Sequence, residues 1–268
     1  MSVKASLMIS VILPVADNDE TLAATIDSVL TQSHANLELI IINDGSTDQS
    51  AKIINAYATK DKRIKTLLCK VRSGGPARPR NLGLQQAQGE LLAFVDADDV
   101  WHPIKLETQL KHLDAHDFDF ISSDCVRFNA DETLDLTLAI DPSPTVTTLN
   151  HESMLRKNRV ITSSMLIKTK KFRELGFNEH ADHIGIEDYL AWLNLLQNPK
   201  IRGAILHLPL VFYRLSSDSL SASKIKMARK IYKLLSNYQI DGRKLGAKKL
   251  FYFICYIVIA IKNRIGAS

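Results

Sequence analysis

The sequence predicts an α/β protein built on a doubly wound, parallel sheet, with a helical tail at its C-terminal end. Short apolar runs alternate with amphipathic segments through the first half, and this order is typical of βαβ units. The apolar runs end in loops rich in Pro, Gly, Asn and Asp. From residue 224 onward, apolar residues recur at helical spacing among lysines and arginines, which predicts the tail.

The first half divides into four strands, with helical segments between them. Strands are predicted at 8–13, 37–42, 64–69 and 91–95. Asp19 is expected to cap the first helix, a second helix runs through residues 53–57, and a third covers 80–87.

The second half is less regular. Helices are predicted at 103–113 and 187–196, strand-like segments at 118–122, 163–168 and 206–213, and a loop-rich excursion at 129–149. Pro209 interrupts the last extended segment.

Composition indicates an ordinary globular protein with ample core. The chain has 268 residues, of which 46% are hydrophobic and 24% are charged. Cys69, Cys125 and Cys255 lie far apart, so they predict neither a metal site nor a disulfide framework, and a reducing cytoplasm is expected. Residues 1–16 are interpreted as leading into a first strand rather than as a signal peptide, because only Lys4 precedes the apolar run.

Three carboxylates follow the fourth strand. Asp96, Asp98 and Asp99 repel one another unless a cation lies among them, and Mg²⁺ or Mn²⁺ shared with substrate phosphates suits oxygen ligands. The alternative is a solvated acidic loop, and the cluster alone does not choose between the two. However, Pro14, Asp44 and Asp96 all fall at carboxyl ends of predicted parallel strands, where such sheets bind ligands. We therefore expect one crevice at this edge.

Several other side chains have both a functional and a structural interpretation. Asp44 is a candidate for reading a nucleobase edge, and Asp48 is expected to cap a helix. Arginines after the glycine-rich loop at 73–76 could bind phosphate, although Arg78 is more typical of a surface residue. Glu187 and Asp188 either stabilise a helix start or supply a general base. His180 and His183 are expected to be exposed, and Trp101 and Trp192 to pack in the core.

The tail, residues 221–268, is strongly basic. It carries eleven Lys or Arg and one acid, Asp241, so it has a charge of +10 and leaves −5 on the remainder. The apolar run 250–261 would extend only about 18 Å as a helix, too short for a hydrocarbon core of about 30 Å. We expect interfacial contact with an anionic membrane; packing on the domain and homodimer formation are the alternatives. No nucleic-acid recognition module is evident.

Five segments together resemble the family 2 glycosyltransferases of the GT-A fold. They are SVILPV (10–15), INDGSTD (42–48), RNLG (80–83), FVDADD (94–99) and GIED (185–188), which occur in the family's order within residues 8–215. The resemblance implies a mixed, mainly parallel sheet. It also implies a nucleotide-sugar half at 1–100 and an acceptor half at 101–220, followed by the tail.

The resemblance further implies an inverting transfer of a hexosyl or N-acetylhexosaminyl group from a nucleotide diphospho-sugar, most simply a UDP-sugar, to a glycan or lipid-linked acceptor. Such an enzyme would extend a cell-surface polysaccharide at the inner face of the membrane. Asp188 is implied as the base, and Asp98 and Asp99 as ligands of Mn²⁺ or Mg²⁺. The implied donor-binding residues are Pro14, Val15, Asp44, Arg80, Asp96, Asp98, Glu187 and Arg214.

The chain departs from the family pattern at three places. Ala16-Asp17 replaces an aromatic residue and Asn, Pro79 precedes Arg80, and Ser216 stands where the family often has His. These departures affect base selectivity, the start of one helix and the metal or phosphate contacts. A non-catalytic sugar-nucleotide-binding protein is the main rival function, and a nucleotidyltransferase is a weaker one.

Overall fold

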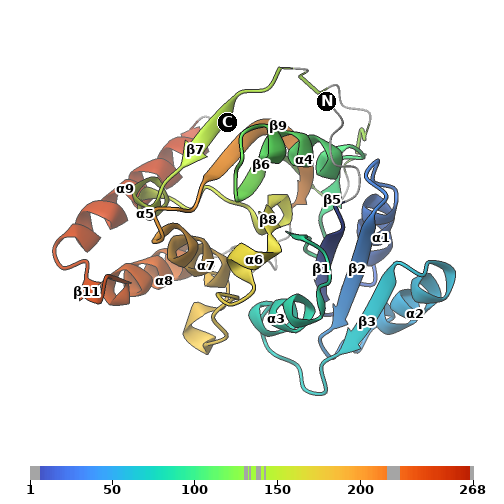
Figure 1. Ribbon diagram of the computed structural model, residues 1–268. Coiled ribbons are helices and arrows are strands. Elements are labelled where there is room, and N and C mark those ends of the chain that lie inside the picture. Colours follow the sequence, from blue (N-terminus) through green and yellow to red (C-terminus); the bar gives the residue numbers. More distant parts are fainter. Residues whose placement is uncertain are drawn as a thin grey trace.

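The computed structural model describes residues 7–129, 132, 134–136, 140–141, 143–215 and 224–265. Its centre is a mixed sheet with helices on both faces (Figure 1). The strands are β1 Ile9–Val15, β2 Leu37–Asn43, β3 Ile64–Leu68, β4 Leu91–Phe94, β5 Val100–Trp101, β6 Phe120–Phe128, β7 Val146–Leu149, β8 Leu166–Lys168 and β9 Gly203–Arg214.

The nine strands of this sheet are mostly parallel. Their order is β3-β2-β1-β4-β8-β6-β9-β5, and β7 pairs with β9. β1, β2, β3, β4, β6 and β9 run in one direction, whereas β5, β7 and β8 run in the other. The predicted α/β class, with a mixed and mainly parallel sheet, is confirmed.

Helices cover each face of the sheet. One face packs against α1 Leu22–Leu30, α2 Ser50–Lys60 and α4 Lys105–Ala115. The other packs against α3 Ala77–Gln86, α5 His151–Arg156, α6 Thr169–Phe172 and α7 Glu187–Leu196. Side chains alternate between the two faces along each strand, so Ile12 and Val11 of β1 belong to separate cores.

Most predicted elements are confirmed, and the differences have local causes. The helix predicted from residue 80 begins at Ala77, which places Pro79 in the first turn, where a missing N–H costs nothing. The first helix begins at Leu22, so Asp19 does not cap it; the Asp19 N–H donates to Asp48 instead (2.9 Å). Asp48 also accepts from the N–H of Ser50 (2.9 Å), the first residue of α2, but it stands one residue before the N-cap position, which is Gln49.

Long-range pairing extends several elements of the second half. The strand predicted at 118–122 continues to Phe128, because β6 pairs with β9 over its length. β7 lies inside the predicted excursion 129–149. The segment predicted as strand from residue 163 begins with a 3-10 turn, Thr162–Ser164, before β8. Pro209 lies where the register between β6 and β9 shifts, as expected for a residue without an N–H.

The tail forms two helices joined by a hairpin. α8 covers Lys224–Asn237, β10 Gln239–Ile240, β11 Arg243–Lys244 and α9 Lys248–Ile265. Asp241 and Gly242 both have positive φ (48° and 75°), as a tight two-residue hairpin requires. Ile231, Leu234 and Leu235 of α8 are buried in the core that α3 and α7 share, so the helices pack on the domain (Figure 1).

Within the described part of the chain, no helix combines the length and the apolar character needed to cross a membrane.

Gly83 sets how closely α3 approaches the sheet. A Cβ at this position would lie 2.7 Å from Cγ2 of Ile12 and 2.8 Å from Cδ1 of Ile42. Such distances are well inside van der Waals contact, so only glycine allows this packing.

Replacing Gly83 with valine should therefore destabilise the fold. The inserted methyl groups have no space against β1 and β2, and overpacking of this kind costs about 1–3 kcal/mol. Urea unfolding followed by circular dichroism measures the change. Gln85→Val, on the exposed side of the same helix, is the matched control; equal stability losses in the two variants would contradict the packing explanation.

Candidate active site

A cavity of about 970 Å³ opens at the carboxyl ends of β1, β2 and β4. It therefore lies where doubly wound sheets bind ligands. Eight residues predicted from the sequence line it: Pro14, Val15, Asp44, Arg80, Asp96, Asp98, Glu187 and Asp188. Two predicted residues, Asp99 and Arg214, do not line it.

Asp44 is fixed at one end of the cavity by the loop after β3. Its carboxylate accepts from the Ser73 N–H (3.0 Å to each oxygen) and from the Ser73 hydroxyl (2.7 Å). The residue is buried, with 3% of its surface exposed. Because its contacts hold one orientation, Asp44 presents a preorganised acceptor to the cavity.

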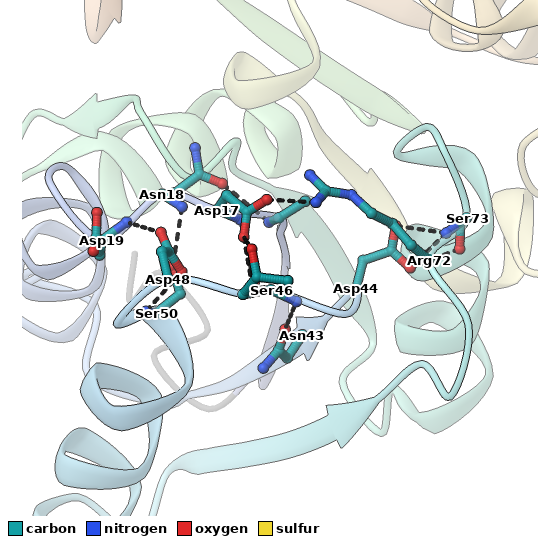
Figure 2. Close-up of polar contacts among 12 residues, drawn as sticks. Asp17, Asn18, Asp19, Asn43, Asp44, Ser46, Asp48, Ser50, Arg72 and Ser73 are labelled. Carbon is teal, nitrogen blue, oxygen red and sulfur yellow. Dashed lines mark hydrogen bonds and ion pairs between the residues drawn. The ribbon is translucent and has the colours of Figure 1, made fainter.

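A second contact ties the loops around Asp44 together, and Figure 2 shows it. Asp17 forms an ion pair with Arg72 and accepts from the Thr47 N–H (2.7 Å). The Thr47 N–H and then Arg72 are the main groups that lower the pKa of Asp17 to about 2. Asp17 adopts φ 56°, a left-handed conformation that Asp tolerates better than most residues.

Sequence reasoning missed the partnership of Asp17 and Arg72, although it noted that no aromatic residue stands at positions 16 and 17. Arg72 also lines the cavity, so an ion pair occupies the region where the family pattern has a ring. The available signal was an Asp after β1 together with an Arg after β3, at the same edge of the sheet.

Arg80 is buried between two carboxylates. Nη2 lies 2.5 Å from Oδ1 of Asp96, and Nη1 lies 2.9 Å from Oε1 of Glu187. Burial disfavours its charge, but Asp96 and Glu187 outweigh burial and raise the pKa of Arg80. Glu187 also accepts from the Gly185 N–H (2.6 Å), so the pair connects α3, the end of β4 and the start of α7.

Asp98, like Asp96, is half-buried and lines the cavity. Burial, followed by the charge of Asp96, raises the pKa of Asp98 to about 6. A positive charge placed nearby would therefore be stabilised strongly.

Asp99 is placed differently. Its Oδ2 accepts from the Ser163 hydroxyl (2.5 Å) and its Oδ1 accepts from the Arg214 N–H (3.1 Å). The residue has no exposed surface, and burial raises the pKa of its carboxyl group well above the usual range. Both oxygens are engaged by protein donors away from the cavity, so the structure does not support the expected ligand role of Asp99. It joins β9 to the loop after β4.

Arg214 contacts the acidic loop but does not line the cavity. Its Nε donates to the Asp98 carbonyl oxygen (3.1 Å), and its guanidinium lies 4.5 Å from the centre of the Phe128 ring. The neighbouring Tyr213 lines the cavity instead. Ser216, the third departure from the family pattern, lies outside the described residues.

Asp188 lies in the first turn of α7 and reaches the cavity. Its Oδ2 accepts from the Thr162 hydroxyl (3.1 Å), and its Oδ1 accepts from the Tyr189 N–H (2.6 Å). Burial and the neighbouring Glu187 raise the pKa of Asp188 to about 6, against the opposing influence of Arg80. A carboxylate with this pKa can take a proton near neutral pH.

The remaining candidates have structural roles. His180 is exposed, as expected, whereas His183 is half-buried and contacts Asn178 through Nδ1 (2.7 Å). Trp101 and Trp192 are buried, as expected for packing residues, and Arg78 is exposed. Among the residues that the structure describes, no three His, Cys, Asp or Glu side chains form a metal-binding group.

The tail contributes part of the cavity wall, which sequence reasoning also missed. Met227 and Ile231 of α8 and Tyr256 of α9 line the same cavity as Asp188. Helical spacing in the tail indicated an apolar face but could not say what that face contacts.

Comparisons with known proteins agree with this geometry. The model of the family described as glycosyl transferase family 2 matches residues 10–178. An uncharacterized glycosyltransferase of Haemophilus influenzae is 33% identical over 253 residues, which are 93% of this chain and 94% of the relative. The Escherichia coli protein WfaP, a UDP-Glc:alpha-D-GlcNAc-diphosphoundecaprenol beta-1,3-glucosyltransferase, is 29% identical over 261 residues, 96% of this chain and 94% of WfaP.

A solved structure shares the fold. Staphylococcus aureus TarS 1-349 in complex with UDP-GlcNAc superimposes with a TM-score of 0.69 at 20% identity, covering 94% of this chain and 72% of the TarS chain. The match of the family model over more than half of the chain, together with the Haemophilus relative, establishes the family. The chain belongs to glycosyltransferase family 2.

Proposed function

We propose that this glycosyltransferase moves a hexosyl or N-acetylhexosaminyl group from a UDP-sugar to a hydroxyl of a lipid-linked saccharide, with inversion at the anomeric carbon. One observation carries the proposal: three carboxylates with different properties line a single cavity. Asp44 is a hydrogen-bond acceptor held in one orientation, Asp98 is suited to bind a cation, and Asp188 is suited to accept a proton. The names of WfaP and of the TarS complex support a UDP-sugar donor and, for WfaP, a diphospholipid acceptor.

The donor is expected to lie with its base at the Asp44 end of the cavity. Asp44 accepts from the base edge, and Pro14 and Val15 border the same region. Asp96, fixed by Arg80, lies between this end and Asp98, within reach of the ribose. Glu187 fixes the other side of Arg80 and so borders the donor without contacting the reacting atoms.

The protein's oxygen ligands fit a divalent cation that the substrate phosphates also bind. Asp98 offers one carboxylate, and Mg²⁺ is commonly held by one or two carboxylates together with substrate phosphates. A bound Mn²⁺ or Mg²⁺ would supply positive charge to the departing diphosphate. Asp98 is the residue that would hold it.

Asp188 is the proposed base. The acceptor oxygen attacks the anomeric carbon while the bond from that carbon to the diphosphate oxygen breaks, and the hydroxyl proton passes to Asp188. UDP leaves with the bonding electron pair. Thr162 and the Tyr189 N–H orient the Asp188 carboxylate for this transfer.

We further propose that the chain works at the inner face of the membrane through peripheral contact. Leu250, Ile254, Val258 and Ile261 form an exposed row along α9, each at least 45% exposed. The exposed Lys248 and the half-buried Lys249 begin the same helix. An apolar row beside basic side chains suits an anionic lipid surface.

Asp98→Asn should remove the metal dependence of UDP binding. Calorimetry with and without Mn²⁺ measures this: the native chain should bind UDP at least ~10-fold more tightly with the metal, since charge-assisted contacts contribute about 1.5–3 kcal/mol. Asp114→Asn, at an exposed position of α4, is the control. Undiminished metal enhancement in Asp98→Asn would place the cation elsewhere.

Asp188→Asn should bind UDP normally but lose transfer by a factor of ~10² or more. In the native chain, kcat at saturating donor, metal and acceptor should rise with pH through about 6 and then level off, because only the ionised form of Asp188 accepts a proton. A variant that keeps native kcat, or a native profile flat from pH 5 to 8, would assign the base to another group.

Leu250→Glu with Ile254→Glu should abolish sedimentation with phosphatidylglycerol vesicles, because two charges interrupt the apolar row. Leu68→Glu with Leu175→Glu, at exposed apolar positions elsewhere, should leave sedimentation unchanged. If the α9 variant instead converts a dimer to a monomer and still sediments, a second copy of the chain covers the row.

A further inference from the structure

Three basic side chains flank the cavity near the tail and have no role in the chemistry derived above. Arg127 lies on β6, where it is the register partner of the cavity-lining Tyr213. Lys157 and Arg159 lie on either side of Asn158, which also lines the cavity. Two separate segments therefore bring positive charge to one border of the cavity.

These cations lack carboxylate partners within the described parts of the chain. None of the three takes part in an ion pair there, whereas the adjacent Arg156 pairs with Glu152 at 2.6 Å. Lys157 is half-buried; burial, and then Arg127 and Arg159, lower its pKa. Like charges gathered without a counterion destabilise one another, so the group is suited to an anion.

Local structure holds the cluster in place. Lys157 ends α5 in an extended conformation (φ −166°, ψ 138°), and Asn158 accepts from the Val160 N–H (3.2 Å). This turn directs the chain along the cavity border. Arg127 is held by the pairing of β6 with β9. The cations thus lie on ordered backbone.

Lys157 and Arg159 follow the end of α5, which packs against α9. The Arg156 guanidinium is 5.7 Å from the centre of the Phe251 ring, so the end of α5 abuts α9 (Figure 1). Tyr256 of α9 lines the cavity, while Ile254 and Val258 of the same helix are exposed. Asn158, between two of the cations, and Tyr256 of α9 therefore line the same cavity.

We propose that Arg127, Lys157 and Arg159 bind the diphosphate that links the acceptor sugar to its lipid. The site rests on the proposed function, because it assumes a saccharide carried on a diphospholipid. The acceptor hydroxyl then lies at Asp188, the diphosphate at the three cations and the lipid chain along α9. Arginine and lysine are the usual phosphate-binding residues, since each donates charge-assisted hydrogen bonds to phosphate oxygens.

Two synthetic acceptors test the site on the full chain. One is GlcNAc α-diphosphate esterified to a short alkyl chain, and the other is the GlcNAc glycoside of the same chain without phosphate. Binding is measured by calorimetry for the native protein, for Lys157→Gln with Arg159→Gln, and for Arg127→Gln. Arg156→Gln, at the neighbouring exposed cation, is the matched control, and thermal melts check that each variant folds.

The expected result is a loss of at least ~10-fold in affinity for the diphosphate acceptor in the cluster variants, as removal of charge-assisted contacts implies. Their affinity for the phosphate-free glycoside and for UDP should stay native, as should all affinities of Arg156→Gln. An equal loss for UDP would overturn the proposal by assigning the cations to the donor. Native acceptor binding with lost vesicle sedimentation would overturn it in favour of lipid headgroups.

The test also separates this inference from the proposed function. A native chain that binds the diphosphate acceptor through the cluster but neither binds UDP nor transfers sugar would refute the enzyme and retain the site. A native chain that transfers sugar while the cluster variants bind acceptor normally would refute the site alone.

Discussion

The buried guanidinium of Arg80 is the interaction on which the rest of the site depends. It enters from α3 and pairs with Asp96 after β4 and with Glu187 at the start of α7, residues that are far apart in the chain. Its two pairs hold the two carboxylates that neighbour the proposed reactive groups, Asp98 and Asp188. Because removing one partner of a buried ion pair leaves an uncompensated charge, the three elements are expected to keep their arrangement as a unit.

Charge is distributed along the cavity in a functional order. At one end, Asp17 and Arg72 form an ion pair beside Asp44, where the nucleotide is proposed to bind. In the middle, burial raises the pKa of both Asp98 and Asp188, which suits the proposed roles of cation ligand and base. Near the tail lie Arg127, Lys157 and Arg159, which form no ion pair among the described residues. This charge distribution would favour different ends of the cavity for the proposed donor and the proposed acceptor, each of which carries a diphosphate.

The two helices of the tail contribute both to the domain core and to the exposed surface. α8 places Ile231, Leu234 and Leu235 in the domain core, and α9 turns Tyr252 inward while Leu250 and Ile254 remain exposed. The catalytic cavity therefore shares a wall with the surface proposed to meet lipid. Removing the tail would expose core side chains as well as the cavity, which is why substitutions on the outer row separate membrane contact from folding.

Local pattern alone was enough to identify the strands β1, β2 and β4, the polar residues at their ends and the acidic start of α7. Apolar runs and the polar residues at their ends are properties of neighbouring residues, and they predicted that Pro14, Asp44 and Asp96 meet in one crevice. The role of Asp188 was implied only by the family resemblance, and the structure places this residue at the same cavity. The remaining features of the site depend on contacts between segments that are far apart in the sequence. Ser163 and Arg214 donate hydrogen bonds to the Asp99 carboxylate, which does not line the cavity. Arg72 forms an ion pair with Asp17. Ile231 and Tyr256 of the tail line the cavity. Sequence spacing carries no information about such partners, because their distances are set by how the helices pack on the sheet.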